Sequence, residues 1–392
     1  MEELIRYAKK RVMRMLLLPL KCIKIKHNQV VVINNLMKKN AGNPKYIALY
    51  LAKEYKNKLK IIYPVSKPEE YSYLVKLGIT PVKYNSFLYF TSCMAAKVLV
   101  TNSGGLSYIP LRRSQYIINT WHGGGCYKKC GTDMFNNSYL FRKDLRLSSK
   151  QINKFLSTNK RFTECVSKAM LVDPDKFWEI GMPRNDMMVH ESSNLRMNIR
   201  KKLKIKEGER LVLFAPTYRK VDDNYFRDSI AISYGIDSKR VLSALEKRFG
   251  GKWIFSIRLH PCIVNREEII TEDMLDLTDY EDMQELLLAA DVMINDFSSS
   301  MWDFMLTGKP CFTFATDLQH YVETTEVYTP VSEWPFPQST NNDELEKTIL
   351  EFDAEQYKKQ CEAHYRSLGG CESGKATELV CKQIYHVCYP KE

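Results

Sequence analysis

Neither a membrane-spanning run nor a signal sequence is evident near the start of the chain. The apolar run Met15–Leu20 has six residues and contains Pro19, whereas a transmembrane helix needs about 20 apolar residues. A signal peptide would need a longer apolar stretch and a cleavage site of small residues, and Lys21 and Cys22 follow instead. We therefore expect no membrane span and no cleaved leader in this region.

The short motifs of several enzyme classes are missing as well. The sequence has no G-x-x-x-x-G-K-[ST] loop and no G-x-G-x-x-G fingerprint, which argues against an ATPase and an NAD-dependent enzyme. Its 11 cysteines are odd in number and lack C-x-x-C spacing, which favours a reduced, cytoplasmic protein over a disulfide framework. Cys126 and Cys130 lie near His122 in the sequence, but no fourth ligand has recognisable spacing, so we predict no metal site.

What the sequence does have is an ordinary globular composition with a basic excess. Its 392 residues are 44% hydrophobic and 27% charged, with a formal net charge of +12. This length favours two domains. The charge favours a phosphate-rich partner, which is nucleic acid, an anionic membrane or a phosphorylated substrate. Because no aromatic-and-basic RNA-recognition signature is present, we predict no nucleic-acid partner.

The first 26 residues hold eight of the basic residues and only two glutamates. On a helical wheel, apolar residues share one face and basic residues lie mostly on the other: Leu4, Ile5, Ala8, Val12, Met15 and Leu16 against Arg6, Lys9, Lys10, Arg11 and Arg14. This pattern is typical of a short basic amphipathic helix lying in the surface of an anionic membrane. The alternative is a soluble helix packed on the body of the protein.

Short apolar runs alternate with helical stretches along the rest of the chain. The runs predict buried strands of parallel sheets at Gln29–Asn34, Lys60–Tyr63, Lys97–Thr101, Tyr116–Thr120, Arg210–Ala215, Trp253–Arg258, Val292–Asn295 and Cys311–Ala315. Helices are predicted at Pro44–Tyr55 with Asn43 as the cap, at Ser238–Phe249 and at Met283–Ala290. The pattern predicts an α/β protein with two Rossmann-like domains that face a cleft.

Gly181 and Pro183 interrupt the pattern and suggest the domain boundary. We expect a basic helix over residues 1–26, a first Rossmann-like domain over 27–180 and a second over 181–375. Residues 376–392 are expected to form a C-terminal helix that can pack back on the first domain. Arg184, in this boundary segment, is interpreted as pairing with Asp186 to hold the hinge.

The stretch Asn119–Gly131 places a histidine between a strand end and a run of glycines. His122 follows Trp121 and precedes Gly123 and Gly124, and Lys128 comes shortly after. Consecutive glycines allow backbone N–H groups to approach a phosphate closely. A histidine at this point can act as a general base on an alcohol. The alternative is a tight turn with a hydrogen-bonded histidine.

A second histidine, His260, stands with Arg258 at the end of the predicted strand Trp253–Arg258. Alternation along an extended chain puts both side chains on the same face. Two such cations suit a pyrophosphate at the carboxyl end of a sheet. The alternative is a structural histidine beside a surface arginine.

Serines follow the predicted strand Val292–Asn295. Asp296 comes first, then Ser298, Ser299 and Ser300, and a helix is predicted from Met301 to Leu306. Hydroxyls and free N–H groups at a helix start make an anion site. Simple helix capping is the alternative, although one serine would suffice for a cap. Thr217 and Arg219, after another predicted strand, complete the candidate phosphate-binding set.

Taken in order, these stretches resemble the CDP-glycerol glycerophosphotransferase family, which includes teichoic acid primases and polymerases. The resemblance covers roughly Lys26 to the carboxyl end, and its motifs are NTWHG followed by KK, GMPRND, LFAPTYR, RLHP, DVMINDFSSSMWDF and DLQHY. It implies a glycosyltransferase-B-like fold and transfer of glycerol phosphate from CDP-glycerol to a hydroxyl of a teichoic acid, capsule or lipid-linked acceptor, with release of CMP. It also implies a peripheral protein at the cytoplasmic face of the cell membrane.

By this resemblance His122 is the candidate base near the acceptor, with Trp121, Gly123, Gly124 and Lys128 in the acceptor loop. His260 would bind or polarise the pyrophosphate with Arg258, Asp296, the serines and Thr217 and Arg219. No cofactor is implied, and Mg²⁺ dependence stays open. The alternatives are CDP-ribitol as the donor or a nucleotide-sugar glycosyltransferase of the same fold.

The sequence departs from the family pattern in two places. Gly124, Gly125 and Cys126 stand where the family commonly has a Thr-Pro-Leu type of sequence after W-H-G, and Glu333–Pro337 replaces a Gly-aromatic sequence. Both changes bear on the acceptor and the polyol more than on the reaction class.

Overall fold

The computed structural model describes residues 2–35, 39–134, 138–190, 192–217, 235–260, 263 and 266–390. They form two compact units. Unit 1 comprises Met1–Asp186 and Leu368–Glu392, and unit 2 comprises Met187–Ser367. The first division therefore lies at Asp186 rather than at residue 180, and the chain returns to unit 1 at Leu368.

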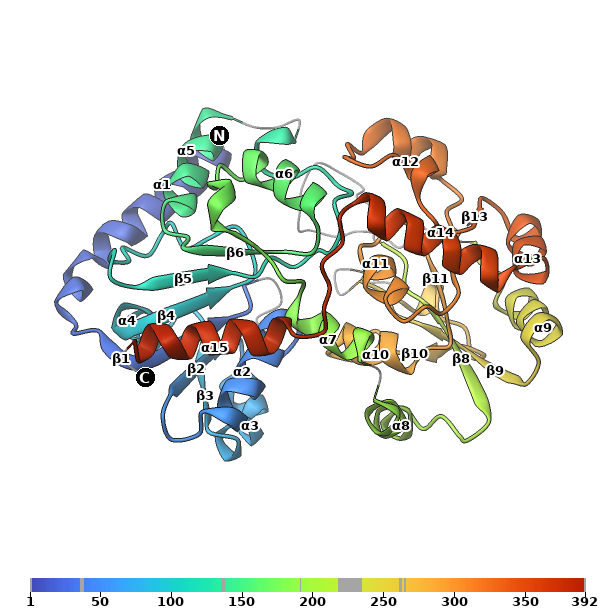
Figure 1. The fold of residues 1–392 in the computed structure, drawn as a ribbon, viewed down its shortest axis with the longest axis horizontal. Coiled ribbons are helices and arrows are strands. Elements are labelled where there is room, and N and C mark those ends of the chain that lie inside the picture. Colours follow the sequence, from blue (N-terminus) through green and yellow to red (C-terminus); the bar gives the residue numbers. More distant parts are fainter. Residues whose placement is uncertain are drawn as a thin grey trace. The chain divides into compact units, whose positions relative to one another are not determined.

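Unit 1 contains a seven-stranded parallel sheet with the order β3-β2-β1-β4-β5-β6-β7 (Figure 1). This order extends the 3-2-1-4-5-6 order of dinucleotide-binding folds, and it reverses between β1 and β4. The apolar residues of these two central strands have no exposed surface, as expected for strands covered on both faces. The strands are β1 (Lys26–Ile33), β2 (Lys60–Val65), β3 (Ile79–Lys83), β4 (Ala96–Thr101), β5 (Tyr116–Asn119), β6 (Lys154–Ser157) and β7 (Phe177–Glu179).

The last helix of the chain packs on the sheet of unit 1. α15 lies against α2 and β4, and its apolar residues join a core that also contains residues of β1 and β2 (Figure 1). The C-terminal segment is therefore part of this unit's core. The helices of unit 1 are α1 (Glu2–Leu16), α2 (Gly42–Glu54), α3 (Tyr73–Lys76), α4 (Phe87–Ala95), α5 (Tyr139–Ser149), α6 (Lys160–Ala169) and α15 (Ala376–Cys388), with α7 (Asp186–Val189) at the division.

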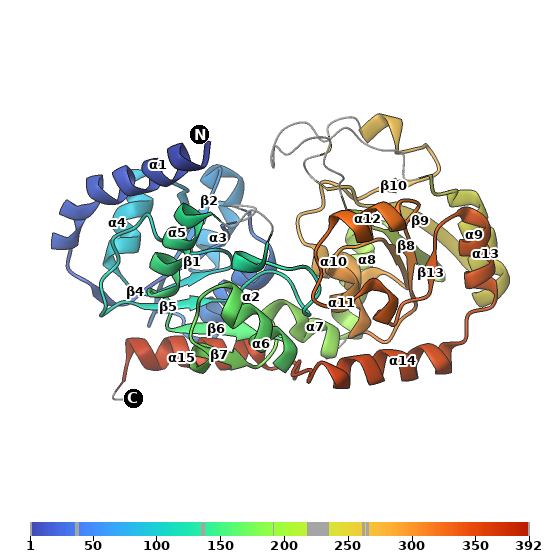
Figure 2. The ribbon, with the colours of Figure 1, turned by 90° about the horizontal axis from the view of Figure 1, so that it is seen from above.

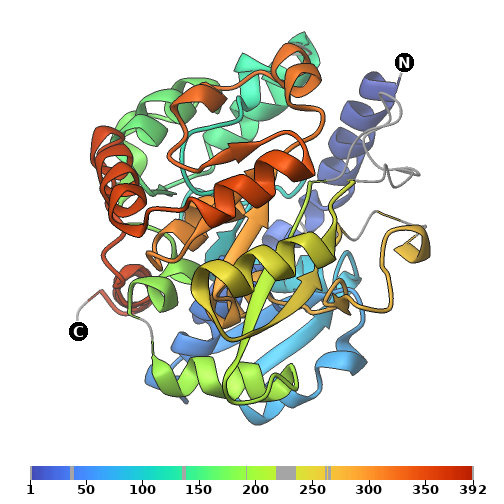
Figure 3. The same ribbon diagram turned by 90° about the vertical axis from the view of Figure 1, so that its right-hand side faces the viewer.

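Unit 2 repeats the same plan with a six-stranded parallel sheet of order β10-β9-β8-β11-β12-β13. Its strands are β8 (Glu209–Phe214), β9 (Lys252–Ile257), β10 (Leu275–Asp276), β11 (Val292–Asn295), β12 (Cys311–Phe314) and β13 (Gln338–Ser339). Helices α9 and α13 pack side by side in this unit (Figure 3). Its helices are α8 (Ser193–Lys202), α9 (Ser238–Phe249), α10 (Met283–Ala289), α11 (Ser300–Met305), α12 (Leu318–Thr324), α13 (Asn342–Leu350) and α14 (Ala354–Ser367).

The predicted α/β class and the two Rossmann-like sheets are confirmed. All eight predicted strands are present, as β1, β2, β4, β5, β8, β9, β11 and β12. The strands that the sequence pattern did not reveal are short or half-exposed. β3, for example, contains Pro81 and alternates between buried and exposed residues, and β10 and β13 have two residues each.

The N-terminal helix α1 packs beside α5 in unit 1 (Figure 2), and its basic side chains make the contacts. Lys10 and Arg11 form ion pairs with Asp144 of α5 at 2.5 and 2.6 Å. Arg14 donates hydrogen bonds to the carbonyl oxygens of Ser107 and Ile109 at 2.9 and 2.6 Å. These contacts point the other face of the helix away from the sheet.

That outer face is apolar. Leu4 is 58% exposed, Val12 48%, Met15 60% and Leu16 69%. The packed-helix interpretation is therefore correct for the basic face only, because the apolar face contacts nothing in the described part of the chain that buries it. In the described residues, no helix is long and apolar enough to cross a membrane.

Candidate active site

His122 follows β5 and lies on a sharply turned backbone. Trp121, just before it, has a left-handed φ of 53°, a conformation that costs a non-glycine residue energy and needs support from its surroundings. The Trp121 amide donates to Oδ1 of Asn119 at 2.9 Å, and the indole ring lies against the imidazole at 4.6 Å between centroids, with the ring planes tilted by 34°. The turn thus places His122 beyond the carboxyl end of the strand, as the sequence predicts.

The imidazole is fixed through one of its two nitrogens. Nδ1 of His122 lies 3.0 Å from the carbonyl oxygen of Asn102, which follows β4. A carbonyl only accepts, so Nδ1 carries the hydrogen and Nε2 of the neutral ring holds the lone pair. Burial, reinforced by the nearby guanidinium of Arg184, lowers the pKa of His122 from its usual value to about 4. The ring is therefore neutral near pH 7 and can accept a proton at Nε2.

The glycine loop after His122 is tightly packed. Gly124 is buried and Gly125 has a φ of +72°, and a Cβ at Gly125 would lie 1.8 Å from the ring of Tyr127. Glycine is thus required at this position by both conformation and space. Gly123 is half-buried and Lys128 is exposed on the same loop. The loop therefore brings the whole predicted acceptor set, Trp121 to Lys128, into one local segment.

In unit 2, Arg258 and His260 follow β9 as the alternation predicts. Leu259 between them is buried, whereas Arg258 and His260 are half-buried. Arg258 donates to the carbonyl oxygen of Tyr280 at 3.2 Å and contacts the sulfur of Met283 at 3.0 Å. Burial, and then the charge of Arg258, lower the pKa of His260. The two groups therefore act on each other, and His260 stays neutral near pH 7.

Asp296, after β11, holds the loop after β8 and has little free surface. Its side chain is 1% exposed. Its carboxylate accepts from the amide of Thr217 at 2.9 and 3.0 Å and from the Thr217 hydroxyl. A carboxylate engaged in this way positions a neighbouring loop, and its charge would repel a phosphate. Asp296 and Thr217 are thus brought together, while Arg219 lies outside the described residues.

The three serines before α11 differ in their surroundings. Ser300 is buried, and its hydroxyl accepts from Asn295 at 2.9 Å and donates to Ser298 at 3.0 Å. Ser299 is exposed and occupies the cap position without a side-chain cap bond. Simple capping by Ser299 is therefore not what the structure shows. Because β9, β8 and β11 are adjacent and parallel, the groups after them lie at one edge of the sheet.

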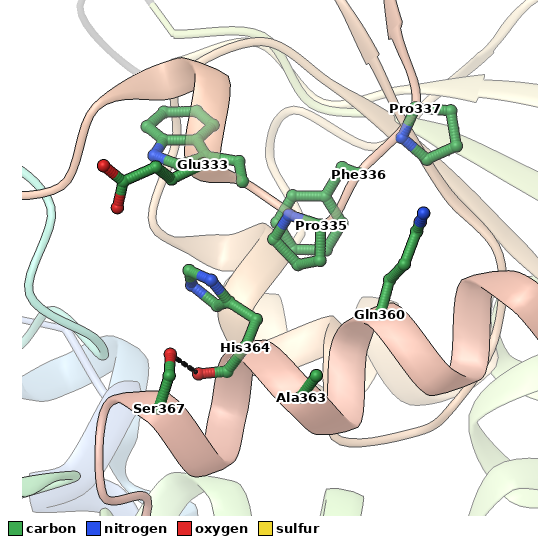
Figure 4. A pocket seen from close by; sticks show the side chains of 9 residues that line it. Glu333, Pro335, Phe336, Pro337, Gln360, Ala363, His364 and Ser367 are labelled. Atoms are coloured by element: carbon green, nitrogen blue, oxygen red, sulfur yellow. Dashed lines mark hydrogen bonds between the residues drawn. The ribbon is translucent and has the colours of Figure 1, made fainter.

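A separate cavity of 490 Å³ opens in unit 2 (Figure 4). It is lined by Glu333–Pro337, the stretch that departs from the family pattern, and by one face of α14 with Gln360 and His364. His364 stacks on Trp302 at 5.3 Å between centroids. Among the described residues, no lysine or arginine lines this cavity, and neither does any described member of the predicted donor set.

In the part of the chain that the structure describes, no group of three or more histidine, cysteine, aspartate or glutamate side chains is placed to hold a metal ion. Cys126, on the glycine loop, is buried, and burial raises the pKa of its thiol.

Sequence reasoning missed Asn102 and Asn43 as parts of the His122 site. Asn102 follows a predicted strand and precedes Ser103 and two glycines, a polar strand end that could have marked it. Asn43 was read as a helix cap, but the cap position of α2 is Ala41. The Asn43 amide instead donates to the carbonyl oxygens of Thr120 and Trp121 at 3.2 and 3.1 Å.

Two parallel α/β units of this strand order, each with a histidine beyond a strand end, define a glycosyltransferase-B-like architecture. The sequence model of the family "CDP-Glycerol:Poly(glycerophosphate) glycerophosphotransferase" matches residues 15–386. The chain belongs to this family.

Relatives in the family synthesise teichoic acids. The chain is 26% identical over 367 residues to a teichoic acid poly(glycerol phosphate) polymerase of Staphylococcus epidermidis, covering 90% of this chain and 50% of that protein. It is 26% identical over 360 residues to a teichoic acid glycerol-phosphate transferase of Staphylococcus aureus, covering 89% of this chain and 90% of the relative. The chain thus spans about half the length of the polymerase and most of the transferase.

Solved structures support the fold. The wall teichoic acid polymerase TagF superposes with a TM-score of 0.81 at 24% identity, covering 100% of this chain and 98% of that chain. A UDP-GlcNAc 2-epimerase from Neisseria meningitidis superposes with a TM-score of 0.52 at 12% identity, covering 91% of this chain and 99% of that chain. The arrangement of elements is therefore shared well beyond recognisable sequence similarity.

Proposed function

We propose that the protein transfers glycerol phosphate from CDP-glycerol to a hydroxyl of a cell-surface polymer or a lipid-linked acceptor, releasing CMP. The observation that carries this proposal is the family match over residues 15–386. Three relatives named for glycerol phosphate match 89 to 92% of the chain, and others match 53 to 58%. Relatives named as ribitol-phosphate polymerases match 57%. Glycerol is therefore favoured over ribitol as the polyol.

In the proposed reaction the acceptor oxygen attacks the phosphorus next to glycerol. A new O–P bond forms, the pyrophosphate P–O bond breaks, and CMP leaves with the bonding electron pair. Nε2 of His122 takes the acceptor proton, because Nδ1 is engaged with the carbonyl of Asn102. Phosphoryl transfer depends mainly on positioning and charge stabilisation, so little more is required of the protein at the acceptor.

The donor side is proposed at the edge of the unit 2 sheet. Arg258, His260 and the hydroxyls of Ser298–Ser300 follow β9 and β11. Hydrogen-bond donors aimed at the phosphate oxygens would stabilise charge as CMP leaves. Asp296 contributes indirectly, by fixing the loop of Thr217. Arg219 lies outside the described residues, and we propose for it the phosphate-binding role that the sequence predicts.

The outer face of α1 is proposed to lie on the cytoplasmic face of an anionic membrane. Its apolar side chains are exposed, and Arg6 and Lys9 are exposed beside them. An apolar stripe flanked by basic residues suits the headgroup region, where each basic residue adds roughly 1 kcal/mol. A peripheral location would bring the enzyme to a lipid-linked acceptor.

The test is release of nucleotide from CDP-glycerol, CDP-ribitol and sugar nucleotides, with and without membrane extract and with Mg²⁺ or EDTA. We expect CMP from CDP-glycerol, dependent on extract and lost in His122→Ala. Release of CMP from CDP-ribitol alone would show that the transferred polyol is ribitol, and the proposed type of reaction would stand. A nucleoside diphosphate from a sugar nucleotide would reject glycerophosphate transfer in favour of glycosyl transfer. Lack of both release and donor binding would reject the proposal outright.

A further inference from the structure

Three successive carbonyl oxygens of the His122 turn accept hydrogen bonds from side chains elsewhere in unit 1. Those of Thr120 and Trp121 accept from Nδ2 of Asn43, on α2. The carbonyl of His122 itself accepts from Nη1 of Arg184. The backbone of the turn is thus held on its carbonyl side over three residues, including the strained Trp121.

Asn43 and Arg184 also contact each other. Oδ1 of Asn43 accepts from the backbone amide of Arg184 at 3.1 Å. Asn43 is 1% exposed and Arg184 is 8% exposed. An asparagine that accepts through its oxygen and donates twice through its nitrogen has a fixed amide orientation. The pair is therefore a rigid, buried clamp on the turn rather than a surface contact.

The segment that carries Arg184 is itself fixed by the returning C-terminal chain. Glu372 accepts from the amide of Met182 at 2.9 Å and from Nδ2 of Asn185 at 2.8 Å. The Asp186 carboxylate accepts from the amides of Ala376 and Thr377 at the start of α15, at 3.0 and 2.7 Å, which ties the same segment to the last helix.

The imidazole ring of His122 is held separately, by residues that follow β1 and β4. Nδ1 of His122 meets the carbonyl of Asn102. The Asn102 side chain donates to Oδ1 of Asn34 at 2.9 Å and accepts from the amide of Asn35 at 2.9 Å. The ring is thus held between an Asn34–Asn102 pair on one side and the Asn43–Arg184 clamp on the other.

We propose that Arg184 and Asn43 are positioning residues for His122, which hold the turn so that Nε2 is presented to the acceptor hydroxyl. The inference rests on the proposed function, in which His122 is the base. Both residues act through the backbone of the turn, and neither is required to touch substrate. Near-attack geometry is sensitive to small displacements, and a shift of about 1 Å can cost on the order of 100-fold in rate.

Because Arg184 is charged, its positioning role predicts an effect on the pKa of His122 that a purely packing role would not produce. Among the described residues, the groups that face the imidazole are Trp121 from its own turn, the carbonyl of Asn102 from the β4 side and the guanidinium of Arg184. Arg184 acts with burial to lower the pKa of His122. Removing the charge while keeping the site folded should therefore raise that pKa, and replacing arginine by lysine should not.

The experiment compares Arg184→Gln, Arg184→Lys and the matched control Arg240→Gln, whose ion pairs with Asp343 and Glu346 lie on the surface of unit 2. CMP release gives kcat and KM for CDP-glycerol, and NMR titration of the His122 ring, assigned with His122→Ala, gives its pKa. For Arg184→Gln we expect kcat to fall 10- to 100-fold, KM to change less than about threefold and the His122 titration to move to higher pH.

Arg184→Lys should have a higher kcat than Arg184→Gln and should keep the pKa of His122 low. Arg240→Gln should match the unaltered protein in both kcat and the pKa of His122. Wild-type kcat and an unmoved titration in Arg184→Gln would overturn the proposal. If that variant unfolds, Asn43→Ala replaces it and should lower kcat without moving KM, and an unchanged kcat there would overturn the proposal. If the unaltered protein neither releases CMP nor binds CDP-glycerol, the proposed function fails, while the NMR titration still tests the Arg184–His122 contact.

Discussion

The buried imidazole of His122 should make unit 1 less stable in acid. In the folded protein the pKa of His122 is about 4, whereas an unfolded histidine has a pKa of about 6.5. As the pH falls below about 6.5, the unfolded chain binds a proton that the folded chain does not. The free energy of unfolding therefore decreases as pH falls through this window, and the decrease is complete below pH 4.

The size of the effect follows from the gap between the two pKa values. Each pKa unit corresponds to 1.36 kcal/mol, so the full difference is about 3 kcal/mol. Between pH 7 and pH 4.5 the decrease due to His122 is about 2 kcal/mol, because the folded group begins to take up its own proton near the lower limit. That is a large share of the stability of an ordinary domain.

The measurement uses His122→Asn, which has no imidazole to protonate and whose amide can still donate to the carbonyl of Asn102. Urea unfolding of both proteins is followed at pH 7 and pH 4.5, and the unit 1 transition is fitted. The variant should lose about 2 kcal/mol less than the unaltered protein over this interval. Carboxylates titrate in both proteins and cancel in the difference. His320→Asn, which replaces an exposed histidine on α12, is the control.

Equal losses in the two proteins would refute the reasoning, because they would mean that His122 binds its proton at an ordinary pH when folded. The same result would remove the argument that the ring is desolvated. A difference of the expected sign in His320→Asn as well would show that the effect does not come from burial of His122.

Three further outcomes follow from the structure. His260→Ala should lower CMP release by about 10²–10³, as expected for loss of one group that stabilises charge on the leaving phosphate, and steady-state kinetics measures it. Leu16→Asp should reduce sedimentation with anionic vesicles by about tenfold or more, because Leu16 is 69% exposed on the outer face of α1. Gly131→Ala should lower the free energy of unfolding by about 1–3 kcal/mol in urea titrations, because its φ is +57° and a Cβ would lie 2.1 Å from a main-chain oxygen of α6.

Two of these changes have a matched control. Val75→Asp alters another exposed apolar residue of unit 1, on α3, and should leave vesicle binding unchanged. Equal losses for Leu16→Asp and Val75→Asp would show that α1 is not a specific membrane contact. Gly78→Ala has a φ of +84° but open space around its Cβ position, so it should cost less than Gly131→Ala. Unaltered turnover in His260→Ala would exclude that residue from the donor site.

The parts of the fold that the sequence predicts are those governed by burial along one segment. Val98–Val100 of β4 and Met293 and Ile294 of β11 are apolar and have no exposed surface, and such runs indicate strands covered on both faces. The same kind of run predicts the strands before His122 and His260, which stand three residues after the ends of β5 and β9. β10 and β13 were missed because two residues cannot produce a periodic pattern.

The orientation of α1 shows what a helical pattern alone leaves open. The sequence separates an apolar face from a basic one, and apolar faces of helices usually turn inward. Here Asp144, far along the chain on α5, accepts ion pairs from Lys10 and Arg11 and turns the basic face inward. That carboxylate and the carbonyl oxygens of Ser107 and Ile109, which accept from Arg14, hold the helix in this orientation. A pattern in residues 1–26 carries no information about their positions.

Asn43 and Arg184 mark the same limit within the active site. Asn43 stands one residue before the helix predicted at Pro44–Tyr55, where asparagine commonly caps, and Arg184 stands two residues before Asp186, where a hinge ion pair is plausible. In the structure Asn43 bonds to Thr120, 77 residues away, and Arg184 bonds to His122, 62 residues away. Sequence rules of this kind compare a residue only with its neighbours in the chain, so they predict a helix cap for Asn43 and a hinge ion pair for Arg184. Both residues act on the His122 turn because the fold buries them at the carboxyl end of β5. That burial depends on how the segment around Arg184 packs against the sheet, which local sequence does not reveal.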